Sequence, residues 1–321
     1  MALTVSRRKT NDVIQTRKTS PSMKHGFTYL KATLAMLFWA VTFVWFKVAF
    51  QLYRPNEIVV MRLLLASLLL FGVMLISRHW QKISGRDLGR MLLVAFCEPF
   101  LYFVGEANGM QYVSSTLGSL VISTIPLLTA FGAWMFLREK ITPWLFVGLI
   151  VSFAGVAVMS MDSTDLSGTL KGIAFLLLAV FAGMFYGILV KRLTHAYSAL
   201  TIVAWQSFFG LLFFLPLFLI FDLKHFIGIQ HQFLPLAAVI GMSLFASVGA
   251  FLLYTGVIRD LGVIRSNVFT NLIPVFTVIL AFLLLGDRLG IRSGLGLGLT
   301  LLGLFVSQYP DLRQLHKRMM G

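Results

Sequence analysis

Long apolar segments follow one another along almost the whole chain, with short polar breaks between them. Each segment has about the 20 residues that an α-helix needs to cross a bilayer, and none alternates as the strands of a membrane barrel do. The pattern predicts an all-α membrane protein with ten transmembrane helices. We place these helices at residues 30–50, 57–77, 88–107, 113–136, 143–161, 170–190, 200–221, 233–256, 264–285 and 290–309.

The composition agrees with this pattern. The chain is 58% hydrophobic and 12% charged, whereas soluble domains carry roughly 25% charged residues. A soluble fold of this size could not hide so much apolar surface from water. The net charge of +15 would suit a nucleic-acid-binding protein if it formed one patch. The lysines and arginines lie between the apolar runs instead, so we expect the lipid bilayer as a partner and no nucleic acid.

The positive charges are distributed unevenly between the two sides of the membrane. If the N-terminus is cytoplasmic, twenty lysines and arginines fall in tails and loops on that side and five on the other. Because cytoplasmic loops carry the excess of positive charge, we predict a multi-pass protein of the cell (inner) membrane with both termini in the cytoplasm. Residues 1–29, with either Met1 or Met23 as the start, are then a disordered basic tail, and residues 310–321 are a second basic tail.

The two halves of the chain resemble each other. Shifted by 148 residues, Thr124-Ile125-Pro126 falls on Leu272-Ile273-Pro274. The same shift pairs Glu139 with Asp287, Gly148 with Gly296 and Gly155 with Gly303, and a shift of 144 pairs Lys47 with Lys191 and Arg62 with Gln206. Each half holds five helices, an odd number, so two tandem copies must insert with opposite orientations. This predicts the inverted repeats of secondary transporters, whose substrate site lies near the bilayer midplane between the repeats.

These repeated motifs resemble the drug/metabolite transporter superfamily, and within it the EamA-type permeases with two five-helix repeats. The matching residues run from Gly118-Ser119-Leu120 through Ile125-Pro126 to Leu137-Arg138-Glu139-Lys140, and from Ser266-Asn267 through Ile273-Pro274 to Gly286-Asp287-Arg288-Leu289. The resemblance implies EamA-like repeats at residues 30–161 and 170–309. It also implies that the chain transports a small solute. The structural residues of the repeat would be Pro126, Glu139, Pro274 and Asp287.

Two acidic residues, Glu98 and Glu106, lie within the third predicted helix. A charged side chain in the hydrocarbon core costs about 3 kcal/mol or more, so such groups usually face a cavity and serve a proton or a substrate. With Tyr102 between them, they form one stripe along the helix, and Pro99 is expected to kink the helix beside Glu98. The structural alternatives are that Glu98 forms an ion pair with Arg62 and that Glu106 is exposed to water at the outer end.

The remaining candidates are basic, polar or aromatic. Arg62 could hold an anionic group of a substrate, neutralise Glu98 or reach toward the interface. Lys47 could also pair with Glu98, but we expect it to be an anchor at the membrane interface and not a ligand. Polar stripes on the fourth and ninth helices could line the path or hold helices together. The full set of candidates for binding substrate or protons is Glu98, Tyr102, Glu106, Arg62, Asn267, Asn271, Trp39, Trp205 and Gln206.

The sequence lacks the common motifs of enzymes and metal sites. It has no His-Glu-x-x-His zinc motif, no Gly-x-x-x-x-Gly-Lys phosphate loop and no Gly-x-Ser-x-Gly elbow. Its one cysteine, Cys97, excludes an internal disulfide, and His195, His225 and His231 fall in predicted loops without metal-ligand spacing. We therefore expect no enzyme activity, no cofactor and no metal. The glycine run Gly290–Gly303 predicts a close-packing face of the tenth helix, or a homodimer contact.

These features predict a secondary transporter of a small molecule. We expect an exporter of amino acids or related small metabolites or drugs, coupled to protons through Glu98. One alternative is an uncoupled facilitator or an importer of a small metabolite. The other is a membrane-embedded protein or enzyme that transports nothing, which the inverted repeat disfavours because that symmetry provides two access states.

Overall fold

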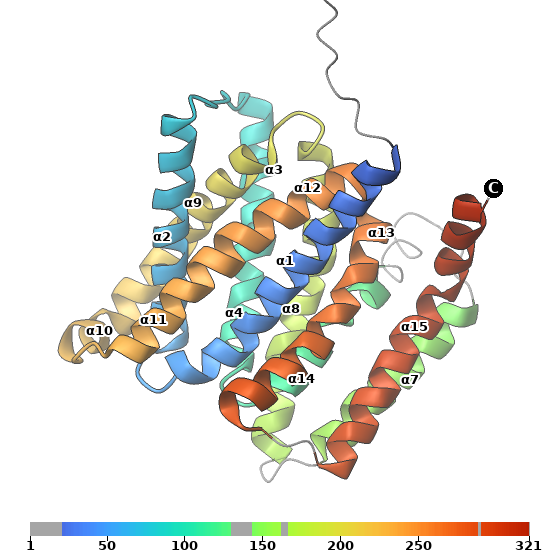
Figure 1. The fold of residues 1–321 in the computed structure, drawn as a ribbon. Coiled ribbons are helices and arrows are strands. Elements are labelled where there is room, and N and C mark those ends of the chain that lie inside the picture. The colour runs from blue at the N-terminus through green and yellow to red at the C-terminus, as the bar shows by residue number, and fades with distance from the viewer. Residues whose placement is uncertain (1–20, 130–142, 162–165, 288–289, 321) are drawn as a thin grey trace, which may run out of the picture.

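The computed structural model describes residues 21–129, 143–161, 166–287 and 290–320. In this part of the chain, helices joined by short turns form a bundle (Figure 1). Seven of the described helices are long and apolar enough to cross a membrane. Three shorter apolar helices, Ser115–Thr129, Phe146–Met159 and Ile291–Val306, complete the ten spans that the sequence predicts.

The helices fall into two halves. The first half contains α1 (Pro21–Ala49), α2 (Pro55–Ile76), α3 (Gly85–Ala95), η1 (Phe96–Leu101), α4 (Tyr102–Gly109), α5 (Ser115–Ile122) and α7 (Pro143–Ser160). The second half contains α8 (Leu166–Leu193), α9 (Ala199–Leu217), η2 (Phe218–Asp222), α10 (Leu223–Gly228), α11 (Phe233–Gly241), η3 (Met242–Ala250), α12 (Phe251–Leu261), α13 (Val263–Val268), η4 (Phe269–Asn271), α14 (Leu272–Leu285) and α15 (Ile291–Met320). Single spans are thus built from consecutive pieces, such as α3–η1–α4 and α11–η3–α12.

Some helices extend beyond the predicted spans. Helix α1 begins at Pro21, so residues 21–29, expected in a disordered tail, form its first turns. Helix α15 continues to Met320, through residues expected in the C-terminal tail. His225, expected in a loop, belongs to α10, because the chain stays helical past the apolar run of the seventh span. The first turn of α1 and the last turn of α15 lie at the same end of the bundle (Figure 1), as an even number of spans requires.

A contact between equivalent residues reveals the symmetry of the two halves. Helices α7 and α15 run side by side (Figure 1). The Ser152 hydroxyl donates to the carbonyl of Thr300 at 3.2 Å, and the Thr300 hydroxyl faces the carbonyl of Ser152 at 3.4 Å. These positions are related by the shift of 148 residues, and equivalent residues contact each other reciprocally only where a two-fold axis passes between them. The chain therefore consists of two inverted five-helix repeats.

Glycines allow α7 and α15 to approach closely at this axis. A Cβ atom on Gly296 would lie 2.6 Å from the carbonyl oxygen of Gly155, and one on Gly303 would lie 2.5 Å from that of Gly148. The two contacts are exchanged by the same two-fold axis. The predicted close-packing face of the tenth helix is confirmed at these positions, and its partner is α7 of the same chain. Small residues permit such approach between membrane helices.

The lysine that ends the first helix of each repeat has the same role in both. Lys47 donates from Nζ to the carbonyls of Met110, at 2.7 Å, and Val113. Lys191 donates to the carbonyls of Ile258, at 3.0 Å, and Arg259, at 3.3 Å. Met110 and Ile258 are also related by the shift of 148. Each lysine thus binds the negative C-terminal end of the third span of its repeat.

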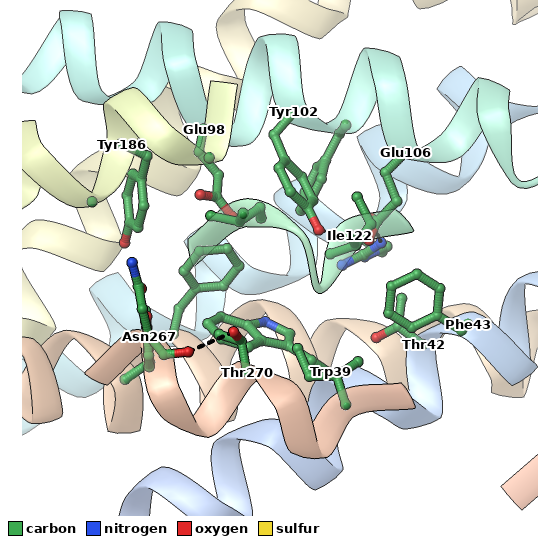
Figure 2. A pocket seen from close by; sticks show the side chains of 18 residues that line it. Trp39, Thr42, Phe43, Glu98, Tyr102, Glu106, Ile122, Tyr186, Asn267 and Thr270 are labelled. Carbon is green, nitrogen blue, oxygen red and sulfur yellow. Dashed lines mark hydrogen bonds and ion pairs between the residues drawn. The ribbon is translucent and has the colours of Figure 1, made fainter. Parts of the chain in front are cut away.

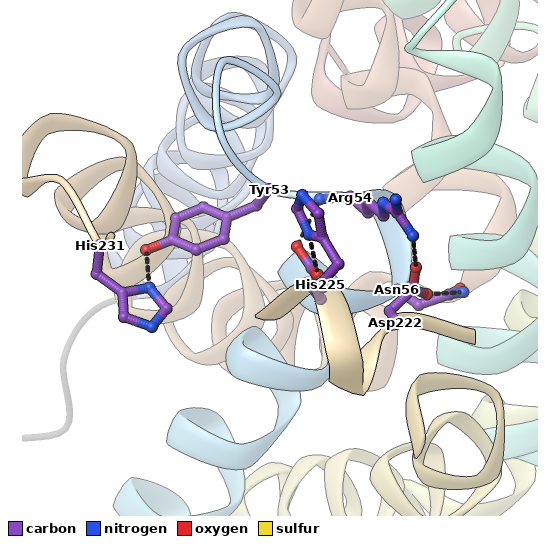
Figure 3. A network of polar contacts seen from close by, with 7 residues as sticks. Tyr53, Arg54, Asn56, Asp222, His225 and His231 are labelled. Atoms are coloured by element: carbon purple, nitrogen blue, oxygen red, sulfur yellow. Dashed lines mark hydrogen bonds and ion pairs between the residues drawn. The ribbon is translucent and has the colours of Figure 1, made fainter. Parts of the chain in front are cut away.

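A polar cluster joins α2 to α10 at the end of the bundle opposite to the two chain ends (Figure 3). We call it the histidine cluster; its members are Tyr53, Arg54, Asn56, Glu57, Asp222, His225 and His231. Asp222 accepts from Arg54 at 3.3 Å and from Asn56 at 2.8 Å, and buried Glu57 lies 2.6 Å from Nδ1 of His225. Burial and the Glu57 carboxylate raise the pKa of Tyr53, so its hydroxyl keeps its proton. This hydroxyl shares a hydrogen bond with Nδ1 of His231 at 3.0 Å.

The other end of the bundle carries the equivalent cluster without histidine. The shift of 144 takes Tyr53 to Tyr197, Glu57 to Thr201, His225 back to Gln81, and His231 back to Asp87. The corresponding contacts are also formed. Tyr197 donates to Asp87 at 3.0 Å, and Thr201 donates to Gln81 at 2.7 Å. The two ends of the bundle therefore carry clusters at equivalent positions of the two repeats. The positions correspond, but the side chains that form the contacts differ.

Candidate functional site

A cavity lies between the two repeats, in the middle of the bundle (Figure 2). Its volume, counted as the space open to the centre of a water molecule, is about 60 Å³. Spans from both repeats contribute to its wall. The lining residues are Trp39, Thr42, Phe43, Arg62, Glu98, Tyr102, Phe103, Glu106, Ile122, Ile125, Gly183, Tyr186, Gly187, Phe251, Tyr254, Asn267, Thr270 and Ile273.

The wall of the cavity follows the internal symmetry of the chain. The shift of 148 pairs the lining residues Phe103 with Phe251, Glu106 with Tyr254, Ile122 with Thr270 and Ile125 with Ile273, and the shift of 144 pairs Thr42 with Tyr186. The cavity is therefore built around the two-fold axis. The acidic side chains belong to the first repeat alone, since tyrosine stands where the second repeat would place Glu106.

Glu98 lies where the third span is interrupted. Its backbone is extended (φ −145°, ψ 118°) inside the π-helical turn η1, and Pro99, which follows it, cannot donate a backbone hydrogen bond. The Pro99 ring packs against Gly210 of α9, where a side chain would collide with it. The break leaves the Glu98 carboxylate at the cavity (Figure 2). Broken helices at membrane depth are tolerated where they line such a space.

The Glu98 carboxylate is buried and unpaired. The residue is 6% exposed, and within the described part of the chain its carboxylate makes no hydrogen bond or ion pair. The expected alternative, an ion pair with Arg62, is not formed. Lys47 is also engaged elsewhere, at the end of α4. Glu98 is thus a buried acid without a protein partner, and such a group is costly unless it holds a proton or faces a cation.

Arg62 is compensated by Glu106 instead. The guanidinium Nη1 lies 3.9 Å from Oε2 of Glu106, and Tyr102 donates its hydroxyl to the other carboxylate oxygen at 3.1 Å. Arg62 also donates to Ser247 at 3.3 Å and stacks on the ring of Phe103, whose centroid is 4.5 Å away. Arg62 is 1% exposed and Glu106 is 4% exposed. Glu106 is therefore a buried member of an ion pair, and the alternative that it is exposed to water is wrong.

The second repeat contributes uncharged polar groups. Tyr254 donates its hydroxyl to Oδ1 of Asn267 at 2.6 Å. The ring of Trp39 meets Tyr254 and Phe251 edge-on, with centroids 4.9 Å and 5.4 Å apart. Tyr186 completes this side (Figure 2). One side of the cavity is thus acidic and the other is aromatic and neutral.

Three of the sequence candidates do not line the cavity. Asn271 and Gln206 are buried at 3% and 2% exposure, behind the wall. Trp205 packs against the aromatic rings of Phe71, Phe208 and Phe209. The sequence alone could not distinguish packing from lining for Trp205 and Gln206, because their helix is apolar on almost every face. Asn271 belongs to the polar stripe of the ninth span, and such a stripe can line a path or hold helices together.

The described structural residues of the repeat motif do not line the cavity. Pro126 and Pro274 are both buried, at equivalent positions of the fourth and ninth spans. Asp287 is exposed just after α14, where Gly286 ends the helix in the left-handed conformation (φ 69°) that glycine favours. Glu139 lies outside the described residues.

Sequence reasoning included neither Tyr186 nor Tyr254 among the candidates. Both tyrosines line the cavity. The internal repeat held the signal, since the shifts of 144 and 148 map Tyr186 and Tyr254 onto Thr42 and Glu106 of the first repeat. Among the described residues no group of three histidine, cysteine, aspartate or glutamate side chains could hold a metal ion.

Comparison with known proteins identifies the fold and the class of function. Residues 26–161 and residues 170–309 each match the EamA-like transporter family. The chain belongs to this family. It is a membrane transporter, and the bilayer and a small-molecule substrate are its partners.

Similar proteins agree with this assignment. An uncharacterized transporter of Bacillus subtilis, YetK, is 30% identical over 254 residues, covering 77% of this chain and 76% of the relative. An uncharacterized transporter of Archaeoglobus fulgidus is 26% identical over 278 residues, covering 87% of this chain and 97% of the relative. A solved crystal structure has the same fold, with a TM-score of 0.66 and 13% identity, over 88% of this chain and 98% of that chain.

Proposed function

We propose that this transporter carries its substrate through the cavity between the repeats and couples the transport to protons at Glu98. The substrates would be amino acids or related small metabolites or drugs, moved outward. The observation that supports this is the buried, unpaired carboxylate of Glu98 at a helix break, on a cavity built around the two-fold axis. Inverted repeats provide the two access states that such transport needs.

The coupling follows if a proton and the substrate compete for the carboxylate of Glu98. In the empty cavity, Glu98 avoids a buried, uncompensated charge by holding a proton. A substrate that carries an ammonium group can replace that proton, because it supplies the missing positive charge. Proton and substrate then occupy the site in turn, and the proton gradient drives the substrate in the opposite direction.

The orientation in the membrane is part of the same proposal. If both ends are cytoplasmic, Lys and Arg residues favour that side by twenty to five, and the first turn of α1 and the last turn of α15 lie at one end of the bundle (Figure 1). The basic segments 1–29 and 310–321 would then be cytoplasmic, and the histidine cluster would face the outside.

Replacing Glu98 by glutamine tests the coupling. Glu98→Gln keeps the shape of the side chain and removes its charge, so the protein should fold. We expect it to lose most transport and to lose the dependence of the remaining rate on pH between about pH 5.5 and pH 8. The rate is measured per folded molecule in proteoliposomes, with amino acids and amines chosen by their stabilisation of the purified protein against heat.

The matched control is Ala246→Ser, at the equivalent position of the second repeat. A serine there can donate to a carbonyl of its own helix, so transport should stay within about twofold of the wild type, a difference of under 1 kcal/mol. A wild-type rate and pH profile in Glu98→Gln would refute the role of Glu98. A lower rate with an unchanged pH profile would favour an uncoupled facilitator.

A further inference from the structure

We infer that the substrate is an organic monocation: an amine or quaternary ammonium compound with an aromatic or apolar body and no free carboxylate. This inference rests on the proposed function, because it takes the cavity as the substrate site. It narrows the class of amino acids and related metabolites to those with a net charge of +1.

The first argument is the charge of the cavity wall. Three lining side chains are acidic or basic: Arg62, Glu98 and Glu106. Arg62 and Glu106 form an ion pair at 3.9 Å, so their charges cancel. Glu98 adds one negative charge when it is ionised. The ligand that makes this buried site neutral therefore carries one positive charge.

The second argument is that the wall offers no cation for a substrate carboxylate. Among the described lining residues, Arg62 is the one basic side chain. Its guanidinium is 1% exposed, donates to Ser247 and is covered by the ring of Phe103. Its Nη1 faces Glu106 at 3.9 Å without a hydrogen bond, but this atom is fully buried, so a substrate carboxylate cannot reach it without moving the wall. A zwitterionic amino acid would satisfy Glu98 with its ammonium group and leave its carboxylate buried without a partner. Such an unpaired charge costs several kcal/mol.

The third argument is the aromatic surface around Glu98. Seven of the eighteen lining residues are aromatic, among them Trp39, Tyr186 and Tyr254. Aromatic faces attract cations, with roughly 0.5–2 kcal/mol for each favourable contact, and they also bury an apolar body. Asn267 and Thr270 can form hydrogen bonds with a neutral polar substituent of that body (Figure 2).

Three probes with one aromatic body separate the alternatives. Phenethylamine is a cation, phenylalanine is a zwitterion and 3-phenylpropionate is an anion near neutral pH. We would titrate each into the purified full-length protein and measure binding by calorimetry. We expect phenethylamine to bind at least about tenfold more tightly than phenylalanine, a difference of about 1.4 kcal/mol, and no binding of phenylpropionate. Repeating the titration in two buffers of different ionisation enthalpy should show that a proton is released when the amine binds.

Two variants test whether the preference for the cation and the release of the proton depend on Glu98. Glu98→Gln should abolish the preference for the cation and the release of the proton. Asp222→Asn, which removes a carboxylate of the histidine cluster outside the cavity, should leave both unchanged. Binding of phenylalanine as tight as that of phenethylamine would overturn the inference. So would equal binding of phenethylamine to the wild type and to Glu98→Gln, or a failure of phenethylamine to bind.

The outcome can be separated from a failure of the proposed function. If phenylalanine binds best and Glu98→Gln abolishes pH-dependent transport, the coupling role of Glu98 stands and the substrate class is wrong. If phenethylamine binds through Glu98 but transport is independent of pH, the substrate class stands and the proton coupling is wrong.

Discussion

At the scale of single residues, the cavity combines one paired acid and one unpaired acid. Glu106 shares its charge with Arg62 and a hydrogen bond with Tyr102, whereas Glu98 has no partner among the described residues. The two glutamates lie eight residues apart, yet their surroundings are opposite. The Arg62–Glu106 pair is already neutral. Glu98 therefore carries the one charge of the wall that a proton or a cationic substrate can neutralise.

The ion pair of Arg62 and Glu106 can be tested by a double-mutant cycle. Arg62→Gln or Glu106→Gln alone leaves a buried charge uncompensated, so each should destabilise the protein by about 3–5 kcal/mol. The double variant should lose less than the sum of the two single losses. Thermal unfolding of the purified protein measures each step.

A surface pair provides the control for this cycle. The side chains of Arg259 and Asp260 are 49% and 34% exposed where they meet at 3.3 Å, and exposed ion pairs contribute about 0–1 kcal/mol. Asp260→Asn should therefore change stability little. Additive losses at Arg62 and Glu106 would mean that the two charges do not interact.

The sequence predicted which acids matter but not how they are paired. Composition and spacing identified Glu98, Tyr102, Glu106 and Arg62, and the structure brings all four to one cavity. In an unbroken helix Glu98 and Glu106 would lie about 80° apart, and either could meet Arg62. The extended backbone at Glu98 breaks this register. A local break of this kind depends on packing against α9, which the pattern of apolar residues does not encode.

At the scale of elements, the crossing of α7 and α15 depends on glycine at particular positions. Gly296 faces Gly155 at the two-fold axis, whereas Gly298, two residues further along α15, has open space where its Cβ would lie. The glycine-rich helix therefore has one packed face and one free face. The sequence predicted the packing face but could not assign its partner, because glycine spacing is the same for contacts within and between chains.

A pair of substitutions distinguishes the two faces. Gly296→Val forces α7 and α15 apart and should destabilise the protein by about 1–3 kcal/mol, the usual cost of overpacking. Gly298→Val should be tolerated, since nothing lies within 4 Å of the added atom. Thermal unfolding and the yield of folded protein in membranes provide the measurement. Equal losses in both variants would contradict the assigned packing.

At the scale of the whole molecule, the symmetry explains how one fold presents two different ends. Equivalent clusters join the same helices at both ends, but only one of them contains histidine. In the orientation proposed from the loop charges, that cluster faces the outside of the cell. His225 and His231 would then be in contact with the external solution, while Gln81 and Asp87 would contact the cytoplasm.

Reporter fusions test this orientation. An enzyme that folds only outside the cytoplasm should be inactive when it is fused after Lys82 and active when it is fused after Gln230. The reason is the concentration of Lys and Arg on the side of Lys82. Activity at both sites would show a miscounted span, and activity only after Lys82 would reverse the membrane orientation and place the histidine cluster in the cytoplasm.

The contact between α7 and α15 also means that the first repeat can finish folding only after the last span has been made. Ser152 and Thr300 are 148 residues apart in sequence, so α7 leaves the ribosome long before its partner exists. The first repeat must wait in the membrane with a glycine-rich face uncovered until the last span is inserted, a long-range contact of the kind that slows folding. A truncation that removes α15 would therefore leave both repeats unfinished, including the one encoded first.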